Sequence, residues 1–181
     1  GARAVVPDEI QGGRSATEIL LQHGQRRIAF INATIPAPAK DGRLEGYREA
    51  LEAAGVPFDP GLVLEAYPDQ EGGYGATEEL LKLGVTAVYC YNDRMAMGLY
   101  DGLREHGLSI PDDMAVVGFD NQEVIAAHLR PPLSTVSLPH YELGAAGVRV
   151  LLGLEEAQAS GPAKIHCPTV QRNSVRALAP A

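Results

Sequence analysis

The sequence is poor in cysteine, lacks tryptophan, and contains no long apolar run. Its two cysteines, Cys90 and Cys167, are too few for a disulfide framework, so we expect reduced thiols. No stretch approaches the roughly 18 consecutive apolar residues of a membrane-spanning helix. Residues 1–10 have neither the basic start nor the apolar stretch of a secretory signal, although a cleaved chain would look the same. We therefore predict a cytoplasmic protein.

Positive charge is also scarce. The chain has 15 basic and 23 acidic residues and a formal net charge of −8. Such a chain repels phosphate backbones at long range, so we expect it to bind DNA poorly by itself. The content of 45% hydrophobic and 21% charged residues is that of an ordinary globular protein. Its 181 residues exceed the roughly 150 typical of one domain, which indicates one large or two small lobes.

Motifs of several enzyme classes are absent. The chain has no phosphate-binding loop of the G-x-x-x-x-G-K-[ST] type, no G-x-S-x-G nucleophile elbow and no H-E-x-x-H zinc motif. Residues 73–78 approach a dinucleotide loop but end in Glu78 and do not directly follow a predicted strand. His166 adjoins Cys167, and no other histidine or cysteine stands at ligand spacing. We predict no enzymatic activity, no cofactor and no metal.

Short apolar runs alternate with longer amphipathic stretches, which is typical of parallel strands joined by helices. The fold class is therefore α/β, a mostly parallel sheet flanked by helices on both faces. Strands are predicted over residues 27–32, 62–66, 87–91 and 114–119, and helices over 13–23, 41–54, 72–83 and 93–107. The rhythm then changes to a short helical piece over 121–129, an extended run over 133–138, a helix over 141–154, a surface turn over 157–161 and a last strand over 165–171.

Polar residues stand where the predicted strands end. Small molecules bind at the carboxyl edge of open parallel sheets, because loops and helix N-termini there present free donors. The strand exits carry Asn32, Tyr67, Asn92 and Asp120, and Arg43 lies near the start of the first crossover helix. These groups could match the donors and acceptors of a hydroxyl-rich ligand. We expect Arg43, Asn92 and Asp120 to meet at one end of the molecule.

Each of these residues also has a purely structural interpretation. Asn92 and Asp120 could cap the helices that follow them. Arg43 could be a solvated helix residue, and Tyr67 a packing residue. The shared location of the four side chains is what favours a ligand site.

Short motifs follow one another in one order along nearly the whole chain. They are GQRRIAF at 24–30, RLEGYREAL at 43–51, GGY at 72–74, YNDRMAMG at 91–98, IPDD at 110–113, VGFDN at 117–121, PPLSTV at 131–136 and RNS at 172–174. Together they resemble the effector-binding region of the LacI/GalR family of bacterial transcription regulators, which has the type I periplasmic-binding-protein fold.

The resemblance implies roles for the residues at the strand exits. Arg43 matches the arginine of the R-L-x-G motif and Asp120 the aspartate of the G-[FY]-D motif, both of which hold the effector in the family. Asn92 matches the asparagine of N-D-x-M-A, which reaches the ligand in sugar-responsive members. The slot of the family's aromatic ring falls on Pro68, so a stacking role for Tyr67 rests on proximity alone.

The resemblance also implies a division of the chain. The helix at 1–23 would lead from a missing N-terminal lobe, 24–130 would form the C-terminal lobe, 131–156 would be a strand and helix of the N-terminal lobe, and 157–181 would return to the C-terminal lobe. By the same resemblance, the headpiece that binds DNA in the family would be missing from these residues. Without their neighbours in that lobe, the strand and helix over 133–154 would have unpaired edges and exposed apolar residues that favour association with another copy.

Family members dimerise partly through the C-terminal lobe. By resemblance, Met97, Tyr100, Leu103 and Leu129 would lie at that contact, in a homodimer. Their alternative interpretation is ordinary core at helical spacing.

These observations predict the effector-sensing part of a LacI/GalR-type transcriptional regulator that binds a small polar ligand, most simply a sugar, and contacts DNA only through the missing headpiece. A sugar-binding protein of an ABC transporter shares the fold and is the alternative. A flavodoxin-like or nucleotide-dependent enzyme is a third class, which a bound cofactor would identify.

Overall fold

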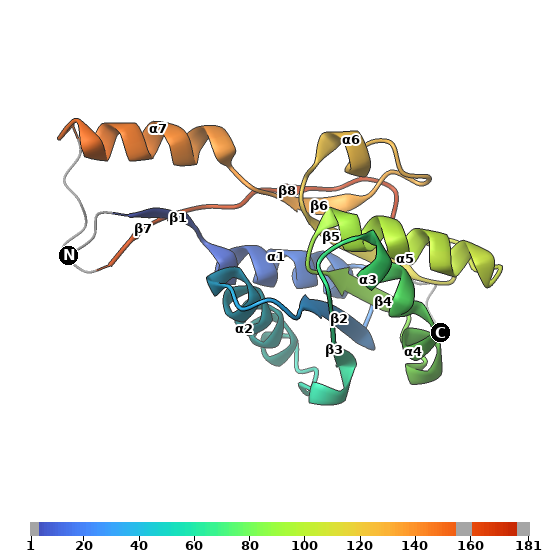
Figure 1. Cartoon of the computed structure of the whole chain (residues 1–181). Coiled ribbons are helices and arrows are strands. Elements are labelled where there is room, and N and C mark those ends of the chain that lie inside the picture. The colour runs from blue at the N-terminus through green and yellow to red at the C-terminus, as the bar shows by residue number, and fades with distance from the viewer. Residues whose placement is uncertain (1–3, 155–160, 177–181) are drawn as a thin grey trace.

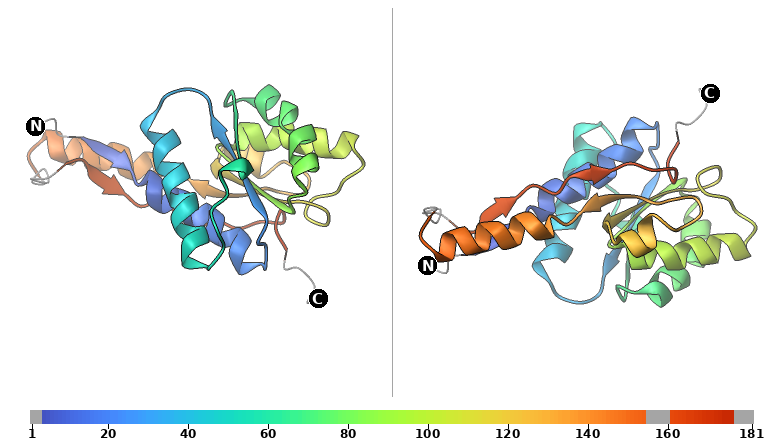
Figure 2. Two further views of the ribbon diagram at one scale, coloured as in Figure 1. Left: turned by 90° about the horizontal axis from the view of Figure 1, so that it is seen from below. Right: turned by 90° about the horizontal axis from the view of Figure 1, so that it is seen from above.

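The computed structural model describes residues 4–154 and 161–176. They form a six-stranded sheet with helices on both faces, and a smaller unit that projects from one end of this body (Figures 1 and 2). The predicted fold class is confirmed.

The main sheet has the strand order β3-β2-β4-β5-β6-β8, and every neighbouring pair is parallel except β6 and β8. Its strands are β2 (Ile28–Ala33), β3 (Val63–Ala66), β4 (Ala87–Cys90), β5 (Ala115–Asp120), β6 (Ser134–Ser137) and β8 (Thr169–Val170). The central strands β2 and β4 are buried along their whole length, which is expected of parallel strands covered on both faces.

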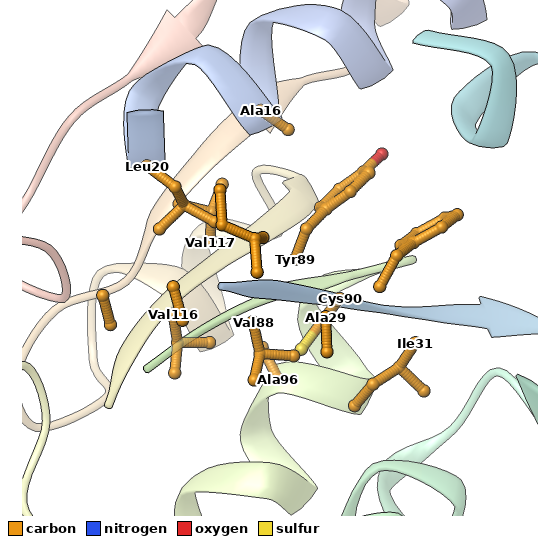
Figure 3. Packing of buried hydrophobic residues seen from close by; sticks show 14 of the residues in the cluster. Ala16, Leu20, Ala29, Ile31, Val88, Tyr89, Cys90, Ala96, Val116 and Val117 are labelled. Carbon is orange, nitrogen blue, oxygen red and sulfur yellow. The ribbon is translucent and has the colours of Figure 1, made fainter. Parts of the chain in front are cut away.

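Helices cover the two faces of this sheet. The helices are α1 (Glu9–Gln22), α2 (Pro38–Ala53), α3 (Gln70–Gly75), α4 (Thr77–Leu83), α5 (Asp93–Glu105) and α6 (Glu123–Ala126), with a short 3-10 turn η1 (Pro60–Leu62) before β3. Figure 3 shows Tyr89 and Val117 on the side of α1, and Val88 and Val116 on the side of Ala96 in α5. The alternation of side chains along each strand thus builds two apolar layers, one under each group of helices.

Several element boundaries differ from prediction, and three of these differences change the elements most. Helix α1 begins at Glu9 rather than at residue 13, because the Asp8 carboxylate caps it by accepting a hydrogen bond from the Gln11 amide at 3.2 Å. The helix predicted over 72–83 is divided at Ala76 into α3 and α4. The strand predicted over 165–171 is two short strands, β7 (Ala163–Ile165) and β8, in different sheets. The turn predicted over 157–161 lies, except for Gly161, outside the described residues.

The expectation that the strand at 133–138 has unpaired edges and stands apart from the C-terminal lobe is wrong. Strand β6 pairs in parallel with β5 and antiparallel with β8, inside the main sheet. The pairing is reinforced by side chains, because the Ser134 amide donates to the Ser174 hydroxyl at 2.8 Å and the Ser134 hydroxyl accepts from the Arg172 amide at 2.9 Å. The assignment of the other segments to lobes stays a prediction.

The projecting unit, here called the arm, consists of β1 (Val5–Pro7), β7 and α7 (His140–Leu151). Strands β1 and β7 pair in parallel and α7 lies along them (Figures 1 and 2). Several large apolar side chains of α7 and the residues after it are exposed: Tyr141, Val148, Leu151, Leu152 and Leu154. Among the described residues, no helix combines the length and apolar character that crossing a membrane requires.

Candidate ligand-binding site

Close packing of α1 on α2 prepares the site. A methyl group added at Gly46 would lie 2.1 Å from the Ile10 carbonyl oxygen, and one added at Gly13 would lie 2.4 Å from the Arg43 carbonyl oxygen. Only glycine allows the two backbones to approach this closely. The glycine of the R-L-x-G motif therefore brings the start of α1 next to Arg43.

Arg43 joins three elements at the carboxyl edge of the sheet. Its Nε donates to Glu9 Oε2 at 2.8 Å, its Nη1 donates to the Tyr91 carbonyl oxygen at 2.5 Å, and its Nη2 lies 3.6 Å from Asp120 Oδ1. The residue is only 3% exposed. The alternative of a solvated arginine is thus wrong, because the guanidinium is held by α1, by the exit of β4 and by the exit of β5.

Two aromatic rings fix the plane of the guanidinium. The Arg43 Cζ atom lies 3.6 Å from the centroid of the Phe119 ring and 4.4 Å from that of Tyr91. Burial lowers the pKa of Arg43, but the neighbouring Tyr89, Glu9 and Asp120 raise it, and the net direction is upward. The group therefore stays a rigid, permanently charged donor.

The Asp120 side chain lies beside this cation, and its residue has an uncommon backbone conformation. Its φ of 101° lies in a region that non-glycine residues rarely adopt, a strain of about 1–3 kcal/mol that the surroundings must hold. Burial raises the pKa of the Asp120 carboxyl, and Arg43 and a hydrogen bond from Gln122 Nε2 at 3.3 Å oppose that shift. The side chain keeps 16% exposure against 4% for Arg43, so Asp120 is the more accessible member of the pair.

A second carboxylate, that of Asp93, is fully buried in the first turn of α5, at the same carboxyl edge of the sheet. Its Oδ1 accepts from Thr135 Oγ1 at 2.7 Å and its Oδ2 from the Gln122 amide at 2.7 Å. A methyl group at Gly118 would lie 2.3 Å from Asp93 Oδ1, so this glycine provides the space. Burial raises the pKa of Asp93 to about 7. Asp93 thus links α5 to the exit of β5 and to β6.

Asn92 acts as the cap of α5. Its Oδ1 accepts from the Met95 amide at 2.9 Å and its Nδ2 donates to the Pro68 carbonyl at 3.0 Å. An amide has two donors and two lone pairs, so one of each remains for a ligand. Tyr67, beyond β3, is 61% exposed and not packed into the core. Asn32 is fully buried, and its Oδ1 accepts a hydrogen bond from the Ala33 amide. It is therefore not among the side chains that can reach a ligand at this edge.

The residues predicted for a dimer contact divide into two groups. Tyr100 and Leu103 are 2% and 0% exposed inside the chain's own core, so their assignment to a surface contact is wrong and the core interpretation applies. Met97 and Leu129 are half-buried. Met97, Tyr100 and Leu103 lie on α5, and Leu129 follows the end of α6. Family resemblance does not say which side of α5 meets the sheet.

Two hollows lie beside the cluster formed by Glu9, Arg43 and Asp120. One of about 530 Å³ is lined by Glu9 and by residues of β1 and α2, and another of about 520 Å³ is lined by Ser137, Leu138, His140 and their neighbours. The second adjoins Asp120, whose carbonyl accepts from the Leu138 amide at 3.3 Å. Both volumes suit a small ligand. Within residues 4–154 and 161–176, no group of three or more histidine, cysteine or carboxylate side chains is placed to hold a metal ion.

Sequence reasoning missed Glu9. With the first helix predicted to begin at residue 13, Glu9 fell outside any element. The signal was present in Asp8-Glu9, a capping residue followed by an acid in the first turn, which is typical of a helix start.

Comparison with known proteins identifies the class. A family described as "Periplasmic binding protein-like domain" matches residues 17–175. The chain therefore belongs to the periplasmic-binding-protein-like domains.

Its relatives narrow this class to LacI-family regulators. The chain is 36% identical to the ribose operon repressor of Haemophilus influenzae over 153 residues, covering 83% of this chain and 46% of the relative. It is 33% identical to the repressor CytR of Escherichia coli, covering 94% and 51%. A LacI family transcriptional regulator from Enterococcus faecium with bound ribose superposes with a TM-score of 0.86 at 33% identity, covering 98% and 67%.

The resemblance drawn from the motifs is thus confirmed. The chain spans about half the length of the curated relatives it matches.

Proposed function

We propose that this chain is the effector-binding part of a LacI-type transcriptional regulator, and that a small polar ligand, in the first place a sugar, binds at Arg43 and Asp120. The observation that carries the proposal is that these two residues, from different motifs, lie 3.6 Å apart at the carboxyl edge of a parallel sheet. Relatives described as repressors, and one with bound ribose, support it.

The chemistry of the pair suits a hydroxyl-rich ligand. The Asp120 carboxylate offers acceptors and keeps some exposure, and the Arg43 Nη2 group offers donors beside it. Vicinal hydroxyls both donate and accept, so they can bridge the two. Asn92 and Tyr67 would contribute at the neighbouring strand exits, Asn92 through its remaining donor and lone pair.

In the full-length regulator, ligand binding would close two lobes and alter DNA binding through the headpiece. Such a shift requires the ligand to have different affinities for the two states. The two curated relatives named above are described as repressors rather than as transport proteins or enzymes, which favours regulation over the transporter alternative.

We further propose that the regulator acts in the cytoplasm as a homodimer. Met97 and Leu129, the two partly exposed candidates, would contribute to the contact. Sedimentation analysis of the full-length protein with either residue replaced by aspartate tests this, because a charge in an apolar contact weakens the dimer.

The ligand site is tested by calorimetric titration with ribose and other sugars. Asp120→Asn keeps the shape of the side chain but removes its charge and one acceptor, so we expect a loss of about 1.5–3 kcal/mol of binding, at least about tenfold in affinity. Asp112→Asn is the matched control, because Asp112 is an exposed partner of Arg176 at 2.7 Å. Equal affinities of the two variants would remove Asp120 from the site.

A further inference from the structure

We propose that Glu9 makes this site selective for uncharged ligands, by neutralising Arg43 and so excluding phosphorylated or otherwise anionic effectors. The inference rests on the proposed ligand site and adds the class of ligand that the site accepts.

The first reason is that the Arg43 guanidinium already donates to groups of this chain. An anion such as a phosphate binds arginine best through two parallel N–H donors on one edge of the fork. Glu9 Oε2 already occupies Nε at 2.8 Å, which takes one donor from the Nε–Nη2 edge. The Tyr91 carbonyl accepts from one N–H group of Nη1 at 2.5 Å, and Asp120 Oδ1 lies 3.6 Å from Nη2. All three guanidinium nitrogens thus already face an acceptor of this chain, which leaves fewer donors for an anion, whereas a single hydroxyl needs only one.

The second reason is that the charges around the site are negative in sum. The cluster holds one cation, Arg43, and two carboxylates, Glu9 and Asp120, so its formal charge is −1. Both carboxylate side chains are 16% exposed, so salt and solvent screen them less than surface groups. Two lysines near this edge have carboxylate partners of their own. Lys40 Nζ lies 2.8 Å from Glu65 and Lys164 Nζ lies 3.7 Å from Asp8.

The helix starts at this edge provide an independent observation. Helix N-termini in α/β proteins commonly bind anions through free amides. Here the Asp8 carboxylate accepts from the Gln11 amide at the start of α1, and the Asp69 carboxylate accepts from the Gly72 amide at 2.9 Å at the start of α3. At the start of α5, Asn92 caps and Asp93 is buried in the first turn. The chain's own carboxylates and amide thus use donors that an anionic ligand would need.

The test compares ribose with ribose 5-phosphate, which differ by the charged group. Binding to the wild-type chain and to Glu9→Gln is followed by NMR shifts of backbone amides near Arg43 and Asp120, at low salt and about pH 8. Glutamine can still accept from Arg43 Nε but carries no charge. We expect the affinity for ribose 5-phosphate, relative to the affinity for ribose, to be about tenfold or more higher in Glu9→Gln than in wild type.

Glu49→Gln is the matched control. Glu49 on α2 pairs with Arg14 on α1 at 2.6 Å, so the substitution removes the same charge from a pair between the same two helices, away from the rim. It should leave both affinities unchanged. A wild-type chain that binds ribose 5-phosphate as well as ribose, or a Glu9→Gln variant with no gain for the phosphate ester, overturns the inference.

Failure of the proposed sugar function gives a different result. In that case ribose does not bind the wild-type chain, while ribose 5-phosphate still gains affinity in Glu9→Gln. If Glu9→Gln does not fold, the wild-type chain decides. Ribose 5-phosphate should bind to it at least about tenfold more weakly than ribose. A phosphate ester that binds as tightly as ribose would contradict the proposal.

Discussion

The body and the arm contain helices that look alike in sequence but differ in what covers them. In α5, Met95, Leu99 and Leu103 are fully buried against the sheet. In the arm, Val148 and Leu151 of α7 are 53% and 82% exposed, although they belong to an equally regular helix. Apolar spacing therefore predicts that a helix forms, and does not predict whether the rest of the described chain covers it.

The largest expected difference between the two regions comes from removing a leucine side chain. Leu99→Ala leaves a cavity in the body and should lower the free energy of unfolding by about 2–5 kcal/mol. Leu151→Ala removes an exposed side chain and should change it by less than about 0.5 kcal/mol. Urea denaturation followed by circular dichroism measures both. Similar losses would mean that α7 is covered by something outside the described residues.

A second pair of variants compares helix packing. Gly46→Ala places a methyl group 2.1 Å from the Ile10 carbonyl oxygen, which must push α1 away from α2. We expect a loss of about 2 kcal/mol even after the helix preference of alanine is included. Gly147→Ala in α7 meets nothing within 4 Å and should raise stability by up to about 1 kcal/mol. Thermal melting of both variants checks the signs, and a neutral Gly46→Ala would show that the helices can separate freely.

The sequence predicts the site residues whose position is set by one strand or helix, and not those whose contacts depend on how helices pack. Arg43 and Asp120 could be predicted because each has a fixed place relative to a strand or helix of a parallel sheet. Glu9 could not, because its contact depends on how closely α1 packs on α2. Tyr100 and Leu103 are predicted at a surface contact by family resemblance alone, and their helical spacing, which also fits ordinary core, does not say which side of α5 meets the sheet.

The buried acid of the body should give the chain a pH dependence. Burial raises the pKa of Asp93 to about 7, above its unfolded value of 3.8, so the folded state binds more protons between these values. Its contribution to stability is therefore greatest at low pH and is lost as the pH rises from about 4 to about 7.

Asp93→Asn removes this dependence while its amide can still bond to Thr135 and Gln122. We expect the loss of stability between about pH 5 and pH 8 to be about 2 kcal/mol smaller than in wild type. Glu142→Gln in the exposed first turn of α7 is the control from the arm and should keep the wild-type pH profile. Urea midpoints at the two pH values measure the effect, and parallel profiles for wild type and Asp93→Asn would exclude Asp93 as its source.

The smallest expected difference concerns ion pairs. Glu9→Gln in the body keeps a hydrogen bond to Arg43 but leaves the buried guanidinium with less compensating charge, so we expect a loss of about 1–2 kcal/mol. Lys164→Gln in the arm removes a pair with Asp8 that is 3.7 Å long and half-exposed, which should change stability by less than about 0.5 kcal/mol. Urea denaturation at low and high salt separates the two cases, because added salt weakens the exposed pair and hardly affects the buried one. A Lys164→Gln loss as large as that of Glu9→Gln would mean that the arm is stabilised by charge to the same degree as the body, and that the contrast between the two regions is limited to apolar packing.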